Sequence, residues 1–524
     1  MPRARRIVPL IVLLCVDARA GDRADEPYTP PDFLAVTPPL PSSLAGADVW
    51  RLDLAEALRI AVRQNLDVVL ERKQVALAEL GVDIAGGAFE PTVTAGYTHG
   101  DAQTPPSSLQ QGGAGEIITS VDDNWRLGIV QRFAAGTRVD LEFTNARDKS
   151  TGGTAVQPLN YQSSLGLTIT QPLLRGFSRD RTIPKLDVLR ASIASERERR
   201  QLAVSIASLV ERAEGAYWGV LLALYRYDLA VRSHNAAEGQ RALTRRQIDS
   251  GTLAPSDLIG AETTLAQRAL ELVQAEEAIH QASDQLRAVL NLPRAEWSRP
   301  ILPIDVPRFA PSAATAEDAL ALAIKNRPEL AQLDLDRKAA LLATRKAVND
   351  ELPQIDLGVS GTLLGQDSGY GGALSQLGST DARAWTVFVN LTWTPLRRST
   401  AAAASIAMLQ QEQTAIRGQQ LLQGVWFEVR EAVRNQLGAE RRVKAAARFR
   451  VLAEDSLAIE QRKFLNGTSQ NLFVAQRQDA LATARLAELD ALLAHTRAST
   501  ALSKVTGRLL SERHIELGAS RGVD

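Results

Sequence analysis

The stretch AWTVFVNLTWT, residues 384–394, decides the fold that we expect for this chain. Apolar side chains stand at every second position, and mostly hydroxyl and amide side chains stand between them. The apolar positions are Trp385, Val387, Val389, Leu391 and Trp393, and the polar ones are Thr386, Asn390, Thr392 and Thr394. Because neighbouring side chains of a β-strand point to opposite faces, this pattern predicts a strand with one apolar and one polar face.

Further segments also show the signs of strands, and some carry charged residues on the polar face. The expected strands cover about 92–100, 124–133, 137–146, 161–172, 354–364 and 384–394. Strands of about ten residues with this pattern are typical of a transmembrane β-barrel around an aqueous lumen. Aromatic residues near strand ends fit an interfacial girdle, and the candidates are Tyr97, Trp125, Tyr161, Trp385 and Trp393. A soluble β-sandwich, which also alternates, is the alternative.

Long helical stretches flank these strands. They cover about 52–88, 183–248, 257–291, 315–350, 399–465 and 471–511. From Leu258 onward the apolar residues recur in alternating steps of three and four, which is the 3.5-residue period of a coiled coil. Residues 183–248 would extend about 100 Å as one helix. Long helices interrupted by strand blocks favour a tube over a solvated coiled-coil scaffold, which is the alternative.

The chain also repeats itself at a fixed offset. Ala57 and Leu58 recur as Ala319 and Leu320, and Pro91 recurs as Pro353. We therefore expect two structural repeats, each made of a helix, strands and a helical hairpin. The first repeat covers 51–292, with strands at 92–172 and a hairpin tip near 251. The second covers 314–511, with strands at 354–394 and a tip near 467. A proline-rich arm at 21–50 precedes them, a linker at 293–313 joins them, and a C-terminal tail at 512–524 follows.

The N-terminus has the pattern of an export signal. Residues 1–6 carry three arginines, residues 7–16 are apolar, and Ala18 and Ala20 are the small residues that a signal peptidase reads. We expect residues 1–20 to be a cleaved signal peptide, because ten apolar residues cannot span about 30 Å of hydrocarbon. A lipid anchor at Cys15 is disfavoured, since the preceding Leu14 is not small.

Composition excludes several classes of protein. Sixty Lys and Arg balance sixty Asp and Glu among 524 residues, which argues against a nucleic-acid-binding protein. Cys15 is the single cysteine, so no internal disulfide and no zinc site built on cysteines can form. Glycine loops for nucleotides and nucleophile elbows are absent from the sequence. We therefore expect no enzyme, no cofactor and no metal site.

Four features, in order, resemble the TolC family of outer-membrane efflux proteins over about 50–511. They are the helix starts 54–58 and 316–320, the helix-to-strand prolines Pro91 and Pro353, the segment 171–176 (QPLLRG), and the turns at Gly251 and Gly467. The resemblance implies an α+β membrane protein, in which a homotrimer forms a transmembrane β-barrel and a long coiled-coil α-helical periplasmic barrel. It places the protein in the outer membrane of a Gram-negative bacterium, with a large periplasmic portion.

The function that the resemblance implies is the exit duct of a tripartite efflux system. Small molecules would pass passively through the duct, while an inner-membrane pump of RND, ABC or MFS type supplies the energy and a periplasmic adaptor protein joins the two. Two alternatives stay open. One is the outer-membrane duct of a type I protein-secretion system, and the other is a periplasmic coiled-coil scaffold without a pore.

The resemblance also implies where the periplasmic tips and the gate of the duct lie. The tip turns would contain Gly251, Thr252, Gly467 and Thr468. The family pattern has an arginine where this chain has Ser469, a tyrosine at Phe464, and aspartates at Phe473 and Gln476, whereas Asp257 is retained.

We expect Phe464 and Phe473 to narrow the tip, with Gln476 and Asp257 beside them, as an apolar gate that closes by dewetting. The alternative is that both phenylalanines pack between helices.

The first strand block departs from the family pattern as well. The simplest family plan has two strands in each half, whereas the first half of this chain has four expected strands. The short turn at 134–137 fits an extra hairpin inside the barrel, and a trimer would then close about 18 strands rather than 12. Otherwise the hairpin lies outside the barrel as a surface flap.

Overall fold

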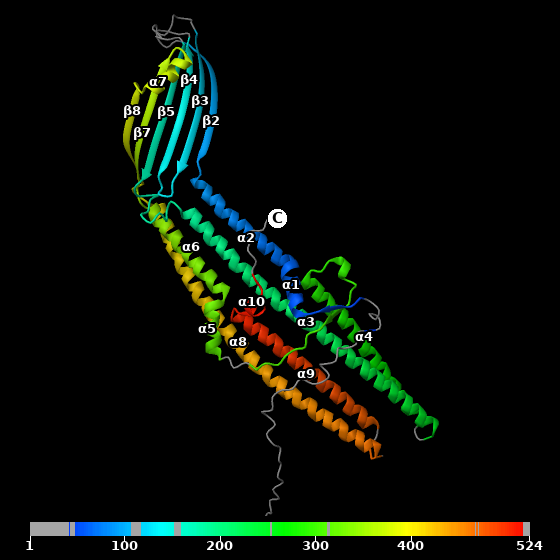
Figure 1. The fold of residues 1–524 in the computed structure, drawn as a ribbon. Helices are drawn as coiled ribbons and strands as arrows, with labels where there is room; N and C mark the ends of the chain where they lie inside the picture. Colours follow the sequence, from blue (N-terminus) through cyan, green and yellow to red (C-terminus); the bar gives the residue numbers. More distant parts are fainter. Residues whose placement is uncertain are drawn as a thin grey trace, which may run out of the picture.

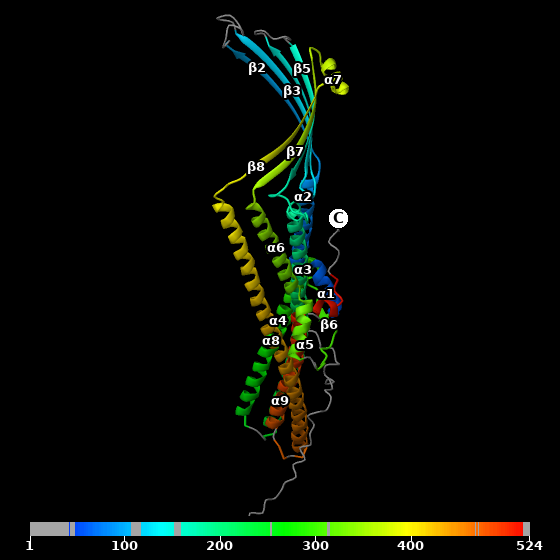
Figure 2. The same cartoon turned by 90° about the vertical axis from the view of Figure 1, so that its left-hand side faces the viewer.

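The computed structural model describes residues 41, 48–105, 117–150, 159–251, 254–311, 315–466, 468–469 and 471–516. The predicted signal peptide, most of the arm and tail, Cys15, Thr252 and Gly467 lie outside these residues. A six-stranded sheet forms one end of the molecule, and long helices run away from it (Figure 1). The sheet is curved, and the helices continue below it as an elongated bundle (Figure 2).

One antiparallel sheet contains all six expected long strands, in the order β2-β3-β4-β5-β7-β8. Their bounds are β2 Thr92–Thr104, β3 Ile118–Arg132, β4 Arg138–Ser150, β5 Leu159–Pro172, β7 Gln354–Asp367 and β8 Arg383–Thr392. The extra hairpin pairs with β2 on one side and with β5 on the other over the lengths of these strands. It is therefore part of the sheet and not a surface flap.

Two helical hairpins make up most of the rest. Their helices are α3 Leu186–Asp249 with α4 Ser256–Leu290, and α8 Arg398–Leu465 with α9 Asn471–Val505. The 64 residues of α3 and the 68 residues of α8 extend about 100 Å each at 1.5 Å per residue. The coiled-coil period predicted for α4 is confirmed, because Leu272, Ile279 and Leu286 pack into the core that α4 shares with α3.

The helices that lead into the strands are each broken once, which corrects the two continuous helices expected there. The observed elements are α1 Leu54–Gln64, α2 Leu66–Gly86, η3 Gly87–Phe89, α5 Ala316–Asn326 and α6 Pro328–Asp350. At the first break, the side chain of Asn65 accepts a hydrogen bond of 3.0 Å from the N–H of Asp67. At the second break, Arg327 is extended, because a proline disfavours helical geometry in the residue before it.

The last expected helix, 471–511, is interrupted too. Helix α9 ends at Val505, and α10 covers Leu509–Glu512. Gly507 has a φ of 72°, and a Cβ atom there would lie 2.7 Å from the carbonyl carbon of Asn326. A glycine is required at position 507, because any side chain there would clash with the backbone at the end of α5.

The expected linker at 293–313 contains structure that its prolines did not indicate. The elements are a parallel pair, β1 Trp50–Leu52 with β6 Ile301–Pro303, and η4 Arg294–Glu296. Asp305 accepts hydrogen bonds of 2.7 Å from the N–H of Leu54 and from the hydroxyl of the fully buried Tyr217. One carboxylate thus fastens the linker to the start of α1 and to α3.

Helix α7, Tyr370–Ser379, lies within a connection where we expected only a loop. It packs against the convex side of the sheet (Figure 2). A Cβ atom at Gly365 would lie 2.0 Å from the carbonyl oxygen of Ala373, so this glycine lets α7 reach the strand.

His495 is a buried polar side chain in the helical part. It is 2% exposed, lies with Nε2 2.9 Å from the side-chain amide of Gln436 in α8, and contacts the ring of Phe309 at 5.0 Å. Burial lowers the pKa of His495, and the nearby Glu440 opposes this shift. The fold therefore favours the neutral imidazole.

This shift predicts a pH dependence of stability. In the unfolded chain His495 takes up a proton at its ordinary pKa of about 6.5, whereas in the folded chain it does so only at lower pH. The contribution of His495 to the free energy of unfolding is thus constant above the unfolded-state pKa of about 6.5, and it becomes destabilising as the pH falls below this value. We expect the thermal unfolding midpoint to fall more in wild type than in His495→Gln between about pH 7.5 and about pH 5.5.

The exposed His280 supplies the control, and His280→Gln should keep the wild-type pH dependence. A His495→Gln protein with that same dependence would show that the buried imidazole is not the cause.

Candidate functional site

One face of the sheet is apolar and largely exposed. The strand register places its side chains in rows across the sheet. One row is Leu141, Leu167, Gly361 and Trp385, and the next is Phe143, Leu165, Leu363 and Arg383. Trp385 is 77% exposed and Val389 is 62% exposed. A continuous exposed apolar surface of this kind marks a site that contacts lipid or another protein.

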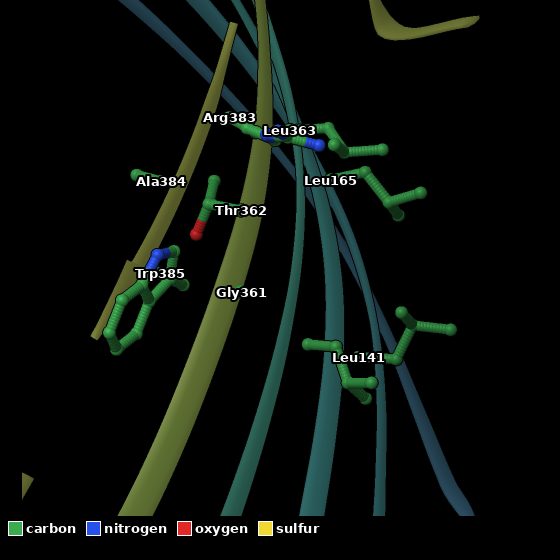
Figure 3. A pocket seen from close by; sticks show the side chains of 9 residues that line it. Leu141, Leu165, Gly361, Thr362, Leu363, Arg383, Ala384 and Trp385 are labelled. Atoms are coloured by element: carbon green, nitrogen blue, oxygen red, sulfur yellow. The ribbon is translucent and has the colours of Figure 1, made fainter. Parts of the chain in front are cut away.

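A shallow hollow of about 440 Å³ interrupts this face at Gly361 (Figure 3). No atom lies within 4 Å of the position that a Cβ atom of Gly361 would take. Leu141, Leu165 and Trp385 line the hollow together with Arg383. Its surface is therefore almost entirely apolar, with one cationic side chain.

The opposite face of the sheet is polar. Arg126 forms an ion pair of 3.0 Å with Glu142, and the hydroxyls of Thr144 and Ser164 lie 2.5 Å apart. Phe388 also lies on this face, and its ring covers Gly358, where a Cβ atom would lie 2.0 Å from Cζ. The alternation predicted from the sequence is thus confirmed as one apolar and one polar face of a single sheet.

A buried carboxylate lies on the apolar face, near the middle of β2 and β3. Asp123 is 6% exposed and accepts a 2.7 Å hydrogen bond from the hydroxyl of Tyr97. The side chains of His99 and Arg147 also contact it, at 2.7 Å and 2.8 Å. Sequence analysis missed this cluster because it depends on the register of three strands, although a charge on the apolar side of β3 was a possible signal.

Of the five girdle candidates, Tyr161, Trp385 and Trp393 lie near strand ends, whereas Tyr97 and Trp125 lie near the middle of β2 and β3, which extend farther than expected. Tyr97 and Trp125 contact each other across β2 and β3, with ring centroids 5.6 Å apart. Tyr161 contacts Tyr370 of α7 at 6.3 Å. Trp385 lies near the start of β8, and Trp393 directly follows its end. Their role as an interfacial girdle stays a prediction.

The segment 171–176, which carried part of the resemblance, joins the sheet to the helices. Gln171 accepts a 2.5 Å hydrogen bond from the hydroxyl of Thr137 in the β3–β4 turn. Gly176 donates its N–H to the side chain of Asn349 at 2.8 Å. Asn349 also donates to the carbonyl oxygen of Leu174 at 3.2 Å. This segment therefore holds the base of the sheet to the end of α6.

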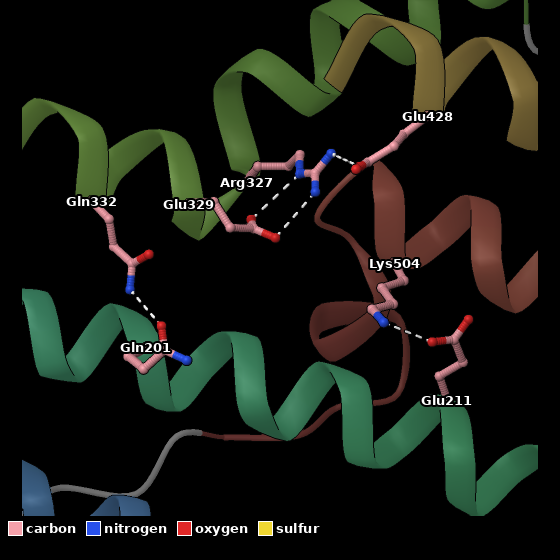
Figure 4. A network of polar contacts seen from close by, with 7 residues as sticks. All are labelled: Gln201, Glu211, Arg327, Glu329, Gln332, Glu428 and Lys504. Atoms are coloured by element: carbon pink, nitrogen blue, oxygen red, sulfur yellow. Dashed lines mark hydrogen bonds and ion pairs between the residues drawn. The ribbon is translucent and has the colours of Figure 1, made fainter. Parts of the chain in front are cut away.

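A belt of polar contacts ties the helices together farther from the sheet (Figure 4). The contacts are Arg327 with Glu329 at 3.1 Å, Arg327 with Glu428 at 2.6 Å, Lys504 with Glu211 at 2.7 Å, and Gln332 with Gln201 at 3.1 Å. They join α3, α6, α8 and α9, so both halves of the chain meet here.

The expected tips lie at the ends of the hairpins that are farthest from the sheet (Figure 1). Gly251 follows α3 with a φ of 75°. At the second tip, Thr468 donates its N–H to the carbonyl oxygen of Lys463 at 2.9 Å. The hydroxyl of Ser469 donates to Glu460, and this bond lowers the pKa of the Glu460 carboxyl. Arg268 of α4 and Asp479 of α9 link the two hairpins by an ion pair of 2.7 Å.

The candidate gate residues lie at these tips. Phe464 is 40% exposed and Phe473 is 46% exposed, on the two helices that the second turn joins. Gln476 and Asp257 are exposed as well. The structure of a single chain leaves both rings accessible to a lumen or to a neighbouring copy.

Two features are absent from the described residues. No helix among them combines the length and apolarity that crossing a bilayer requires. No group of three or more His, Cys, Asp or Glu side chains in the described ranges is placed to hold a metal ion.

The fold of this chain is similar to that of solved outer-membrane proteins. Three similar structures are a membrane protein from Pseudomonas aeruginosa (18% identity, TM-score 0.64, covering 92% of this chain and 96% of that one), the MtrE outer membrane channel of Neisseria gonorrhoeae in its open state (17%, 0.60, 90% and 94%) and the outer membrane protein VceC of Vibrio cholerae (13%, 0.61, 87% and 96%). No curated protein sequence matches the chain.

Part of the sequence matches a family model. Residues 319–508 match the family described as outer membrane efflux protein. The predicted resemblance to the TolC family of outer-membrane efflux proteins is therefore confirmed, as is a fold that combines long helices with a β domain.

The conformation of the first tip turn generates a test. Nothing lies within 4 Å of a Cβ atom built at Gly251, so Gly251→Ala adds only backbone strain, of about 1 kcal/mol. Gly260→Ala lies in α4 with equally open surroundings, and there alanine should add about 0.5–1 kcal/mol of stability. Thermal unfolding followed by far-UV circular dichroism should move the midpoint down for the first variant and up for the second. If both variants moved the unfolding midpoint in the same direction by the same amount, the left-handed conformation at Gly251 would be contradicted.

Proposed function

We propose that this chain is the outer-membrane exit duct of a tripartite efflux system. Small molecules cross the duct passively, and a partner pump in the inner membrane supplies the energy. One observation carries the proposal: a curved sheet with an exposed apolar convex face and a polar opposite face continues directly into helices of about 100 Å. The duct performs no chemistry on its cargo.

The apolar face of the sheet contacts lipid, and the polar face lines the lumen. On β7 the apolar positions run from Ile355 to Leu363, which is about 27 Å along a strand. A tilt of about 40° reduces this to a height of about 20 Å, close to the apolar band of outer-membrane barrels. The sheet therefore lies in the outer membrane, and the helices extend into the periplasm.

The two edges of the sheet support association of copies into a closed ring, which in this proposal is the homotrimer that the family resemblance implies. Strands β2 and β8 each have one partner strand within the described part of the chain. They run in opposite directions, so β8 of one copy can extend an antiparallel ladder with β2 of the next. Unpaired backbone groups are costly in lipid, and a closed ring of copies satisfies both edges.

Two structural repeats underlie this arrangement, at 51–292 and 314–511. Helices α1 and α5 both have 11 residues, and each is followed by a break and a longer helix that leads into the sheet. Both α3–α4 and α8–α9 then form hairpins whose tips lie away from the sheet. The tips receive the periplasmic adaptor protein, which joins the duct to a pump of RND, ABC or MFS type.

The proposed function can be tested in a strain that lacks the gene. We expect the deletion strain to become hypersensitive to some members of a panel of antibiotics, dyes, bile salts and metal ions, with an unchanged set of exported proteins. Normal growth with one missing exported protein would indicate a type I secretion duct instead. A protein that remains soluble after osmotic shock would contradict both ducts.

A matched pair of variants tests the assignment of the two faces. Val387 lies on the apolar face of β8 and is 55% exposed, and Thr386 beside it lies on the polar face. Val387→Arg should cost about 2–4 kcal/mol if it enters lipid, whereas Thr386→Arg should cost little. We expect only Thr386→Arg to restore resistance and to reach the outer-membrane fraction at wild-type amounts. If only Val387→Arg restored resistance, the apolar face would line the lumen and the polar face would contact lipid.

The tip gate gives a further prediction. Replacing both Phe464 and Phe473 by alanine removes the apolar constriction, so the conductance of the purified channel should rise at least about twofold. Leu472→Ala is the control, because Leu472 is 59% exposed beside Phe473. An unchanged conductance in the double variant would eliminate the apolar gate and favour packing of both rings between helices.

A further inference from the structure

The sheet contains more strands than the helices beneath it require. Strand β2 continues from α2, β5 leads into α3, β7 continues from α6, and β8 leads into α8. Strands β3 and β4 instead meet each other in the turn at 134–137 and join no helix at the base of the sheet. Each chain therefore brings six strands and four helices to this junction.

The β3–β4 turn is built into the junction. Besides the hydrogen bond from Thr137, the side chain of Gln171 donates to the carbonyl oxygen of Ala135 at 3.4 Å. A Cβ atom at Gly136 would lie 3.3 Å from both the carbonyl oxygen of Gly176 and Cγ of Pro184. These contacts hold the turn in line with the ends of the neighbouring strands.

The numbers of strands and helices determine two circumferences. Twelve helices at about 9–10 Å from axis to axis give a ring of roughly 110–120 Å. Strands about 4.8 Å apart and tilted by about 40° each occupy about 6.3 Å of a barrel's circumference. Eighteen strands then give about 113 Å, whereas twelve give about 75 Å. The larger barrel is thus about as wide as the helical ring, and the smaller one is narrower.

We propose that three copies of this chain close a barrel of 18 strands, which is as wide as the helical tube beneath it. This inference rests on the proposed trimeric duct and deepens it. The barrel radius is about 18 Å, against about 12 Å for twelve strands, so the cross-section between backbones is about twice as large.

The wide barrel implies a class of cargo. The lumen-facing side chains are polar and include the Arg126–Glu142 ion pair, so they favour hydrated solutes. A duct of uniform width does not sieve such solutes at the outer membrane. The barrel therefore suits bulky hydrophilic or amphiphilic cargo, and selection by size falls to the tips.

Spin-label distances in the assembled protein test the width. Val130 of β3, Asp140 of β4 and Thr168 of β5 form one row across the polar face. Cysteines introduced at Val130 or Thr168 label one lumen site in each copy, since Cys15 is the single natural cysteine and lies in the predicted signal peptide. In a symmetric trimer the separation of equivalent labels is about 31 Å for 18 strands and about 21 Å for 12.

We expect both Val130→Cys and Thr168→Cys to give the same long separation in double electron–electron resonance. A short separation at Thr168 with a longer one at Val130 would mean that the hairpin leaves the barrel, which overturns this inference but leaves the duct intact. Absence of any separation between copies would mean a monomer, which overturns the proposed trimer as well. Labelling at Ser360, opposite Thr168 on β7, repeats the measurement if one variant fails to assemble.

Discussion

Pairing of backbone groups along the six-stranded sheet is the constraint on which the rest of the structure depends. Every strand interior to the sheet is paired on both sides, and only the outer edges of β2 and β8 lack a partner in the described part of the chain. Because lipid offers no hydrogen bonds to backbone N–H and C=O groups, an open edge cannot remain in a membrane. The curvature of the sheet and the proposed association with further copies would both meet this requirement.

A large apolar core around α3 holds the helical part together, and a few polar contacts add to it. Asp305 joins the linker to α1 and to Tyr217 of α3, and the belt around Arg327 joins α3, α6, α8 and α9. Tyr217 and Arg327 are largely buried and need their partners, so these contacts favour one arrangement of the helices. The long hairpins extend from this region, with their tips at a fixed distance from the sheet.

Sequence periodicity predicted the strands and the long helices well, because each depends on local alternation of side chains. It failed where geometry depends on distant residues. The break at Asn65 involves a cap and a 3.0 Å hydrogen bond to the carbonyl oxygen of Val289, and Gly507 is needed because it has a φ of 72° and lies against Asn326 at the end of α5. The Asp123 cluster depends on strand register. Positions such as Phe464 were predicted from resemblance, and a single chain does not reveal what they face.

The sheet is divided along the chain, and this division affects the order of assembly. Strand β5 ends at Pro172, and its neighbour β7 begins only at Gln354. Pairing them closes a loop of about 180 residues, whose entropic cost is lowest when the intervening hairpin α3–α4 has already folded back on itself. The folded α3–α4 hairpin thus brings the two parts of the sheet, β2–β5 and β7–β8, together. In the proposed duct, insertion into the bilayer would follow this pairing.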